Sequence, residues 1–244
     1  MRRMNKIKRI YDTLFTAFGS QGWWPIISDK TLLCEYHVNA PRKEQEALEI
    51  AFGAILAQNT QWSPNVVRAL QQLKLGNLID VKKIISINNK KLAEIIRSSG
   101  YHNQKAKKLK NFCEFLLKNH NCNLENLFAN SSEKLRNGLL SINGIGPETA
   151  DSIMLYAAKK PIFVIDAYTR RIFNRIGHKE KIYDELQKLF MDNLINNEKL
   201  FNEYHALLVK LGKEICQKNP LCEKCPINIY CDYYNDKKLN SVAV

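Results

Sequence analysis

Residues 140–157, LSINGIGPETADSIMLYA, restrict the possible fold more than any other part of the chain. An apolar helical pattern ends just before the segment's centre, where Gly144 and Gly146 flank Ile145. Pro147 then stands where the next helical pattern begins. Glycine permits a tight turn because it has no Cβ, and proline is favoured in the first turn of a helix. The segment therefore predicts two helices joined by a tight turn.

A turn of this kind can bind an anion. The backbone N–H groups of the turn and of the following helix N-terminus can hold a phosphate, helped by the helix dipole. A helix-hairpin-helix grips the DNA backbone in this way without reading sequence. An ordinary tight turn between two helices explains the same residues equally well, so the segment alone leaves both interpretations open.

The charge of the chain bears on that choice. There are 37 basic and 24 acidic residues among 244, a formal net charge of +13. Such an excess favours a polyanionic partner, nucleic acid before an anionic membrane surface, although it also serves solubility. No apolar run approaches the ~18 residues that a membrane helix needs. The start, MRRMNKIKRI, is basic but has neither an apolar h-region nor a small-residue cleavage site, so no secretory signal is expected. We expect a cytoplasmic, nucleoid-associated protein with no membrane partner.

Helical periodicity dominates the rest of the chain. Besides the two helices around the turn, we expect helices at 7–18, 44–57, 64–73, 90–98, 104–119, 166–176, 180–196 and 199–215. The apolar segment PIFVI at 161–165 is the only candidate for a strand. The predicted fold class is all-α.

Four of the seven cysteines fall within 16 residues near the C-terminus, in the pattern C-x5-C-x2-C-x5-C. A disulfide scaffold would distribute them through a small secreted chain, which this is not. Four thiolates at this spacing can hold one [4Fe–4S] cluster, and a zinc site with four thiolates is the alternative. The proposed ligands are Cys216, Cys222, Cys225 and Cys231. The other three, Cys34, Cys113 and Cys122, are interpreted as ordinary cysteines.

An acidic residue, Asp166, follows an apolar run in FVIDAYTRRIF and starts an arginine-rich helix. Aspartate is a common N-cap, which is the ordinary explanation for it here. That role is compatible with a second one, because a capping carboxylate at the rim of a cleft can also face a substrate.

These segments together resemble the endonuclease III superfamily of DNA glycosylases. GIGPETA is followed by VIDAYTRR and then by the clustered cysteines. LAQNT at 56–60 and GYHNQKAKKLK at 100–110 occur in the family's order, so the resemblance covers nearly the whole chain. The first gap of the cysteine pattern has five residues here, whereas the family has six.

The resemblance implies two helical domains. A six-helix barrel with the helix-hairpin-helix would occupy residues 45–160. Residues 1–44 and 161–244 would form a second helical domain that carries the iron–sulfur loop at 216–231. DNA would lie across the groove between them, with the hairpin and Asp166 at its mouth. The expected partner is double-stranded DNA with a damaged base, bound by a monomer.

The departure from the family at Glu148 affects the predicted reaction. Bifunctional members have a lysine there, which forms a Schiff base with the sugar, and a carboxylate cannot do this. We therefore expect monofunctional hydrolysis of the N-glycosidic bond. Within the superfamily, GIGPETADSI with QGWWP resembles the 3-methyladenine glycosylase branch, whose substrates are alkylated purines. Glu148 can orient water or simply complement the helix dipole, so it is a doubtful catalyst.

The resemblance also assigns roles to individual residues. Asp166 would stabilise the oxocarbenium-like sugar after the base has left the stack. Trp24 and Trp62 would be walls of the pocket for a cationic base, although tryptophans are more often core anchors. Gln58 would fill the hole left by the base, and Tyr101 would wedge beside its partner.

Phosphate contacts are expected from the turn and from basic helix faces, although such faces are usually just solvated. The DNA-binding set comprises Gln58, Tyr101, Gly144, Ile145, Gly146 and Arg170, with Lys105, Lys107, Lys108, Lys110 and Arg171 as further candidates. His205, amid apolar neighbours, is interpreted as structural. Two other functions remain open: a glycosylase for oxidised or deaminated bases, with lyase activity from another amine, and a catalytically silent protein that binds DNA or senses redox state.

Overall fold

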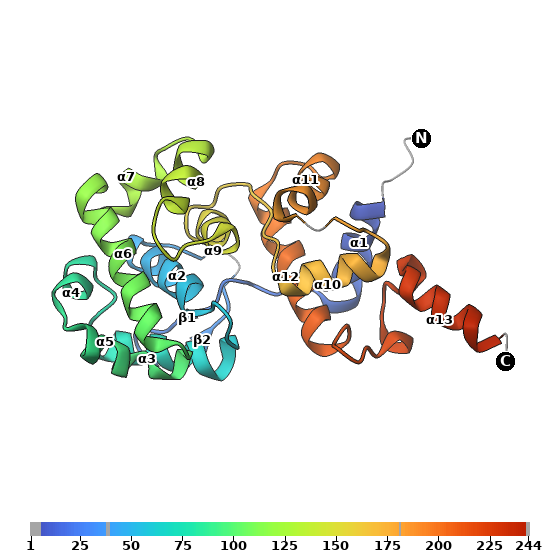
Figure 1. Ribbon diagram of the computed structural model, residues 1–244, viewed down its shortest axis with the longest axis horizontal. Helices are drawn as coiled ribbons and strands as arrows, with labels where there is room; N and C mark the ends of the chain where they lie inside the picture. The colour runs from blue at the N-terminus through green and yellow to red at the C-terminus, as the bar shows by residue number, and fades with distance from the viewer. Residues whose placement is uncertain (1–5, 38–39, 181, 243–244) are drawn as a thin grey trace. The chain divides into compact units, whose positions relative to one another are not determined.

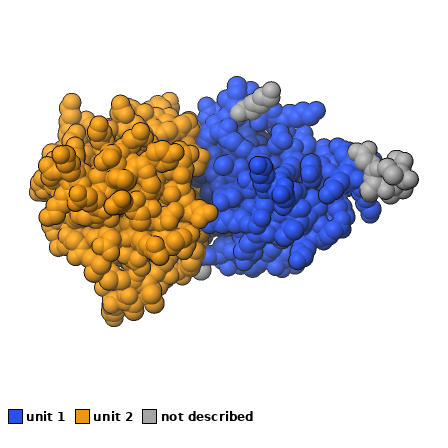
Figure 2. Space-filling view, turned by 60° about the horizontal axis from the view of Figure 1, so that its bottom comes forward, with its two compact units in different colours: residues 1–22, 161–244 blue, residues 23–160 orange. Residues whose placement is uncertain are grey.

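The computed structural model describes residues 6–37, 40–180 and 182–242. Within these ranges helices dominate and the strands amount to one two-stranded pairing, which confirms the all-α class (Figure 1). Every helix there is too short or too polar to cross a lipid bilayer. The chain divides into two compact units, coloured separately in Figure 2. We call Trp23–Lys160 the central unit, and Met1–Gly22 with Pro161–Val244 the terminal unit.

The central unit is built on a nearly all-apolar helix, α2, which is buried from Glu46 to Leu56. The longest helix of this unit, α6, packs against α2, α4 and α5 (Figure 1). The helices of this unit are α2 (Glu44–Leu56), α3 (Val67–Leu75), α4 (Val81–Ser86), α5 (Asn89–Ile95), α6 (His102–His120), α7 (Leu124–Phe128), α8 (Ser132–Leu140) and α9 (Pro147–Ser152). A π-helical turn, Ile153–Ala157, continues α9. The turn Trp62–Val66 precedes α3, and Ser63 within it has an extended backbone (φ −109°, ψ 133°), next to the helix start that the sequence predicts at Pro64.

Residues 23–44 belong to the central unit, so the predicted domain boundary near residue 44 differs from the structure. The strand β1 (Ile26–Ile27) pairs antiparallel with β2 (Cys34–Glu35). The N–H of Ile27 donates a 2.6 Å hydrogen bond to Glu49, a buried carboxylate on α2, and Lys74 of α3 lies 2.9 Å from the other oxygen of Glu49. These bonds attach the segment to α2 and α3, which the apolar pattern does not reveal.

The terminal unit is assembled around α12. This helix packs against α1 and α10. The hydroxyl of the fully buried Tyr204 on α12 donates a 3.0 Å hydrogen bond to the carbonyl of Ile7 on α1, which explains why the N-terminal helix joins the C-terminal ones. The helices are α1 (Lys6–Phe18), α10 (Ala167–Ile176), α11 (Tyr183–Asn193), α12 (Glu198–Glu214) and α13 (Asp232–Val242).

The strand candidate at 161–165 does not form a strand: the segment is an irregular connection in the terminal unit, with Phe163, Val164 and Ile165 buried. Side chains of α11 satisfy its backbone. Gln187 donates to the carbonyl of Phe163 at 2.6 Å, and the N–H of Ile165 donates to the hydroxyl of Tyr183 at 3.2 Å. Since buried backbone groups need partners, these side chains replace the neighbouring strand that a sheet would supply.

Candidate active site

The tight turn of the central unit has the predicted geometry. It joins α8 to α9, and Pro147 begins α9. Gly144 has a φ of +95°, and a Cβ on it would lie 2.5 Å from Cγ of Lys108. Gly146 is the N-cap of α9 and makes no side-chain cap hydrogen bond. Because a Cβ on Gly146 would meet nothing within 4 Å, the backbone there is open to a close approach by a ligand. Ile145 is buried, so its side chain anchors the turn and only its backbone can contact DNA.

Gln58 is bonded to this turn. Its Nε2 donates to the carbonyl of Gly144 at 3.0 Å and to Oγ1 of Thr149 at 2.9 Å. Its Oε1 accepts a short hydrogen bond from the Lys108 ammonium. The side chain predicted to fill the space left by a base is therefore engaged with the hairpin in this structure.

Tyr101, the predicted wedge, is at the N-terminus of α6. Its φ of +47° is left-handed, which is uncommon for a residue other than glycine. The side chain is 66% exposed. A large aromatic ring held outward on a strained backbone favours a binding role.

The aromatic side chains predicted as pocket walls belong to a larger cluster in the central unit. Trp24 and Trp62 are buried and meet edge to face, with ring centroids 4.9 Å apart. The buried indole N–H of Trp24 has no hydrogen-bond partner among the described residues, whereas that of Trp62 interacts with the thiol of Cys34. The half-buried Trp23 contacts both of these rings and also Tyr36, which is exposed.

This cluster depends on a glycine of α2. A Cβ on Gly53 would lie 3.3 Å from atoms of both Trp24 and Trp62, so the rings lie directly on the helix backbone. The sequence analysis missed Trp23 and Tyr36 as the members nearest the surface. The doubled tryptophan of QGWWP was the available signal for Trp23, and no sequence signal identified Tyr36.

In the terminal unit, Asp166 is the N-cap of α10. Its Oδ1 accepts a 2.7 Å hydrogen bond from the N–H of Thr169. Its Oδ2 lies 3.7 Å from Nε2 of His205 on α12, and its side chain is 14% exposed. The capping role and a substrate-facing role are thus compatible in the same residue.

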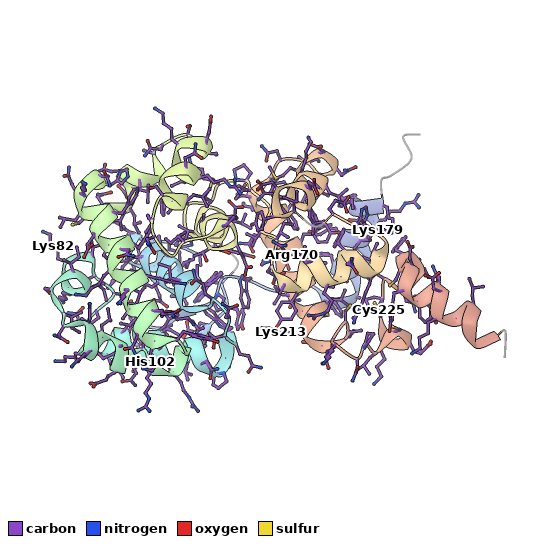
Figure 3. The ribbon with its side chains drawn as sticks, in the orientation of Figure 1. Lys82, His102, Arg170, Lys179, Lys213 and Cys225 are labelled. Carbon is purple, nitrogen blue, oxygen red and sulfur yellow. The ribbon has the colours of Figure 1, made fainter. Side chains whose placement is uncertain are left out.

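The charge of Asp166 affects the pKa of two further groups. Its carboxylate raises the pKa of the Lys213 ammonium on α12, but burial acts more strongly and lowers that pKa overall. Burial, followed by Asp166, raises the pKa of the Tyr168 hydroxyl. Figure 3 labels Lys213 on α12 and Arg170 on α10. The sequence analysis did not single out Lys213.

Glu148 lies in the first turn of α9 with its side chain exposed. The position carries no amine, as the sequence indicates. An acid in the first turn complements the helix dipole, so this location is explained without any catalytic role.

Four of the basic side chains expected to contact phosphate have structural partners, and one of them is Lys108, bonded to Gln58. Lys105 is buried and donates to the carbonyls of Leu56 at 2.7 Å and Ser99 at 2.6 Å. Burial, with a smaller effect of Lys108, lowers the pKa of Lys105 to about 8.

Lys110 donates to the carbonyl of Ile85, in the last turn of α4, and to that of Ile87, the C-cap of α4. Arg171 donates to the carbonyls of Gly212 and Cys216 and so ties α10 to the end of α12. Lys107 is exposed, as is Arg170, whose guanidinium lies 5.6 Å from the ring centroid of Tyr183. These two keep side chains available to solvent.

The four clustered cysteines line one pocket after α12, together with Arg175 of α10. The guanidinium of Arg175 donates to Sγ of Cys216 at 3.2 Å and to the carbonyls of Gln217 and Lys218. Sγ of Cys231 donates to the carbonyl of Arg175 at 3.3 Å. Burial raises the pKa of the Cys225 thiol to about 11, and the other three sulfurs add to this effect. Within residues 6–37, 40–180 and 182–242, no three histidine, cysteine or acidic side chains are arranged to hold a metal ion directly.

Comparisons with known proteins agree with the motif-based resemblance. Residues 52–194 match the HhH-GPD superfamily of base excision DNA repair proteins. A protein of Methanocaldococcus jannaschii named as a DNA repair glycosylase is 40% identical over 94% of this chain and 97% of its own length. Endonuclease III of Sulfolobus acidocaldarius is 29% identical over 81% of this chain and 87% of its own length.

Solved structures of DNA glycosylases are also similar to this chain. The crystal structure of H. pylori 3-methyladenine DNA glycosylase bound to 1,N6-ethenoadenine has a TM-score of 0.68 and 29% identity, covering 85% of this chain and 95% of that one. A trapped endonuclease III–DNA covalent intermediate has a TM-score of 0.75 over 98% of this chain and 100% of that one. At 18% identity, this second likeness shows the fold alone.

Proposed function

Because this chain belongs to the HhH-GPD superfamily of base excision DNA repair proteins, it is a DNA N-glycosylase, and we propose that it is a monofunctional one acting on alkylated purines such as 3-methyladenine. The observation that carries the proposal is that the chain has a carboxylate, Asp166, with one oxygen outside its N-cap hydrogen bond, and also has Glu148 where a covalent route would need an amine. The similarity to the H. pylori 3-methyladenine glycosylase supports the substrate class. The proposed partner is double-stranded DNA, bound by a monomer in the cytoplasm.

The proposed reaction is hydrolysis through a cationic sugar. The damaged nucleotide is extruded from the duplex, since its glycosidic bond cannot be reached inside the stack. The bond between C1′ and the base nitrogen breaks, and its electron pair leaves with the base. Asp166 stabilises the positive charge that develops on the sugar, and water adds to C1′ and releases a proton. No covalent bond between the DNA and the protein forms at any step of this reaction.

An alkylated purine is a good leaving group because it already carries positive charge. The faces of electron-rich aromatic rings attract cations. Trp24 and Trp62 are proposed to line the pocket for such a base, with the half-buried Trp23 as the cluster member closer to solvent. The indole N–H of Trp24, which has no partner among the described residues, is a donor that a base with an acceptor nitrogen can satisfy.

The four-cysteine loop is proposed to hold a [4Fe–4S] cluster. The donor set fits, because four thiols line one pocket and a guanidinium beside Cys216 offsets thiolate charge. When bound, the cluster supplies structural cross-linking of this loop. Purified protein should be brown with about four irons per chain. A colourless protein with one zinc per chain would refute the cluster.

The decisive experiment is a panel of oligonucleotides, each with one alkylated, oxidised or deaminated base. Half of each reaction is treated with alkali. Strand breaks seen only after alkali, and strongest for alkylated purines, are expected. Breaks without alkali would refute monofunctional hydrolysis, and binding with no base released from any lesion would indicate a catalytically silent homologue.

A second candidate function is a glycosylase with lyase activity. It is favoured by the environment of the Lys213 amine on α12. The amine is electrostatically coupled to Asp166, and burial lowers its pKa. A lowered pKa leaves more of the amine unprotonated and able to attack C1′. Borohydride trapping of a protein–DNA adduct that disappears in Lys213→Gln would establish this activity.

A further inference from the structure

The two oxygens of Asp166 have different surroundings. Oδ1 is committed to the N-cap hydrogen bond with Thr169. Oδ2 faces Nε2 of His205 at 3.7 Å. Because a carboxylate is planar, a group that restrains the second oxygen also sets the rotation of the whole plane.

His205 is well placed to act as that restraint. It lies on α12 with 5% of its surface exposed, and the ring of Phe163 meets it edge to face at 6.4 Å between centroids. The adjacent residue Tyr204 is fully buried and bonded to the carbonyl of Ile7. Helix α12 also packs directly on α10, which Asp166 caps. The imidazole therefore has little freedom to rotate away from the carboxylate.

We infer that His205 is a positioning residue for Asp166, holding Oδ2 from the α12 side while the N-cap holds Oδ1. The inference rests on the proposed glycosylase function and adds a residue to it. At 3.7 Å the contact is longer than a hydrogen bond, and such contacts often shorten when substrate binds. His205 does not touch the sugar; it acts through the carboxylate.

The inference has a consequence for pH dependence. Burial lowers the pKa of His205 from the ordinary 6.5, and Asp166 opposes this shift. The ring is thus neutral at pH 7 and gains a proton in more acidic solution. Once protonated, it pairs with Asp166 and withdraws the negative charge that the sugar cation needs. Lys213 of α12 and Tyr168 of α10 also interact electrostatically with Asp166; burial lowers the pKa of Lys213 and raises that of Tyr168, and in acidic solution both groups keep their protons.

Two substitutions test the inference. Gln places an amide nitrogen near the position of Nε2 and does not titrate, whereas Leu keeps the bulk and offers no donor. At pH 7.5, His205→Leu should lower the single-turnover excision rate about tenfold with DNA affinity within about twofold of wild type. His205→Gln should stay within about threefold and should lose the fall in rate that protonation of His205 causes in acidic solution. Full activity and an unchanged pH profile in both variants would overturn the inference.

A measurement that needs no activity separates this inference from the proposed function. The pKa of His205, one of five histidines, can be followed by NMR titration in wild type and in Asp166→Asn. Removal of the carboxylate should lower the pKa of His205. An unchanged pKa would show that the two groups do not interact, even if wild type excises the base. Conversely, a clear shift in a protein that excises no lesion would leave the contact intact and refute the glycosylase proposal.

Discussion

The hairpin of the central unit and the Asp166 group of the terminal unit hold their polar side chains in different ways. Around the hairpin, Gln58 is hydrogen-bonded to Gly144, Thr149 and Lys108. Around Asp166, one oxygen is bonded and the other faces a titratable ring.

This difference indicates two kinds of contribution. The hairpin offers backbone groups whose direction is set by turn geometry, and its side chains serve to hold that geometry. Asp166 offers a negative charge, and its neighbours, His205 among them, determine how much of that charge is available to a substrate. Changes at the hairpin should therefore alter DNA affinity uniformly across sequences, whereas changes at Asp166 should alter the rate and leave affinity nearly constant.

The largest expected effect is that of Asp166→Asn. Asparagine is an equally good N-cap, so α10 should keep its stability. Loss of the negative charge should lower the single-turnover excision rate by about a hundredfold or more. The rate on a 3-methyladenine oligonucleotide and the Kd for the same duplex would be measured together.

Circular dichroism and Tm serve as the control for this variant. If the Kd rose as much as the rate fell, Asp166 would contribute to DNA binding, and its proposed difference from the hairpin would be wrong. If the rate stayed at the wild-type level, Asp166 would have no catalytic role.

The next effect is expected at the turn. Gly144→Ala places a Cβ at a φ of +95° and within 2.5 Å of the Lys108 side chain. The strain of about 1–2 kcal/mol should distort the turn and weaken DNA binding roughly tenfold, with or without a lesion. Gly146→Ala is the strain-free comparison: a Cβ there meets no protein atom within 4 Å and the φ is −96°, so any loss of affinity in this variant comes from obstructing the approach of DNA.

Titrations of both variants against damaged and undamaged duplexes check this prediction. Equal losses for Gly144→Ala and Gly146→Ala would mean that turn strain does not control the affinity. A loss confined to damaged DNA would place the turn in lesion recognition rather than in backbone binding.

The parts that the sequence predicts well are those determined by local chemistry. The glycine turn followed by Pro147, and the N-cap Asp166, both depend on residues within a few positions of each other. Long-range contacts were not predictable in this way. The buried Lys105 is one of several lysines on α6 that look alike in sequence, and only tertiary packing sends its amine to the carbonyls of Leu56 and Ser99.

Short helices were also missed for a physical reason. The helices α4 and α7 have six and five residues, too few for an apolar period to repeat. Their N-caps, Asp80 and Asn123, were the available local signals. The contact between Asp166 and His205 joins residues 39 positions apart, so the carboxylate was predictable and its neighbour was not.

A smaller effect, on the pH dependence of stability, is expected from the buried amine of Lys105. It tests whether this lysine of the central unit has a structural role. Its pKa of about 8 in the folded protein lies below the ordinary 10.5. Between these values the unfolded chain binds more protons, so stability should rise with pH. The free energy of unfolding of wild type minus that of Lys105→Met should increase by about 1 kcal/mol from about pH 7.5 to about pH 9.

Chemical denaturation of the two proteins at each pH gives this difference and cancels the other titrating groups. A difference that stays constant would mean that Lys105 remains protonated, well solvated and available to phosphate, as the sequence first suggests. A uniform loss of DNA affinity in Lys105→Met would support the same conclusion.

The smallest effect is expected for Glu148→Gln, which tests whether the hairpin carries any catalytic charge. The side chain is exposed in the first turn of α9, where a negative charge complements the helix dipole. Its removal should cost about 0.3–1 kcal/mol of stability and change the excision rate less than about threefold. DNA affinity should rise slightly, because one charge that repels phosphate is lost. A hundredfold fall in rate at unchanged Kd would instead make Glu148 a second catalytic acid, and the hairpin would then supply chemistry as well as binding.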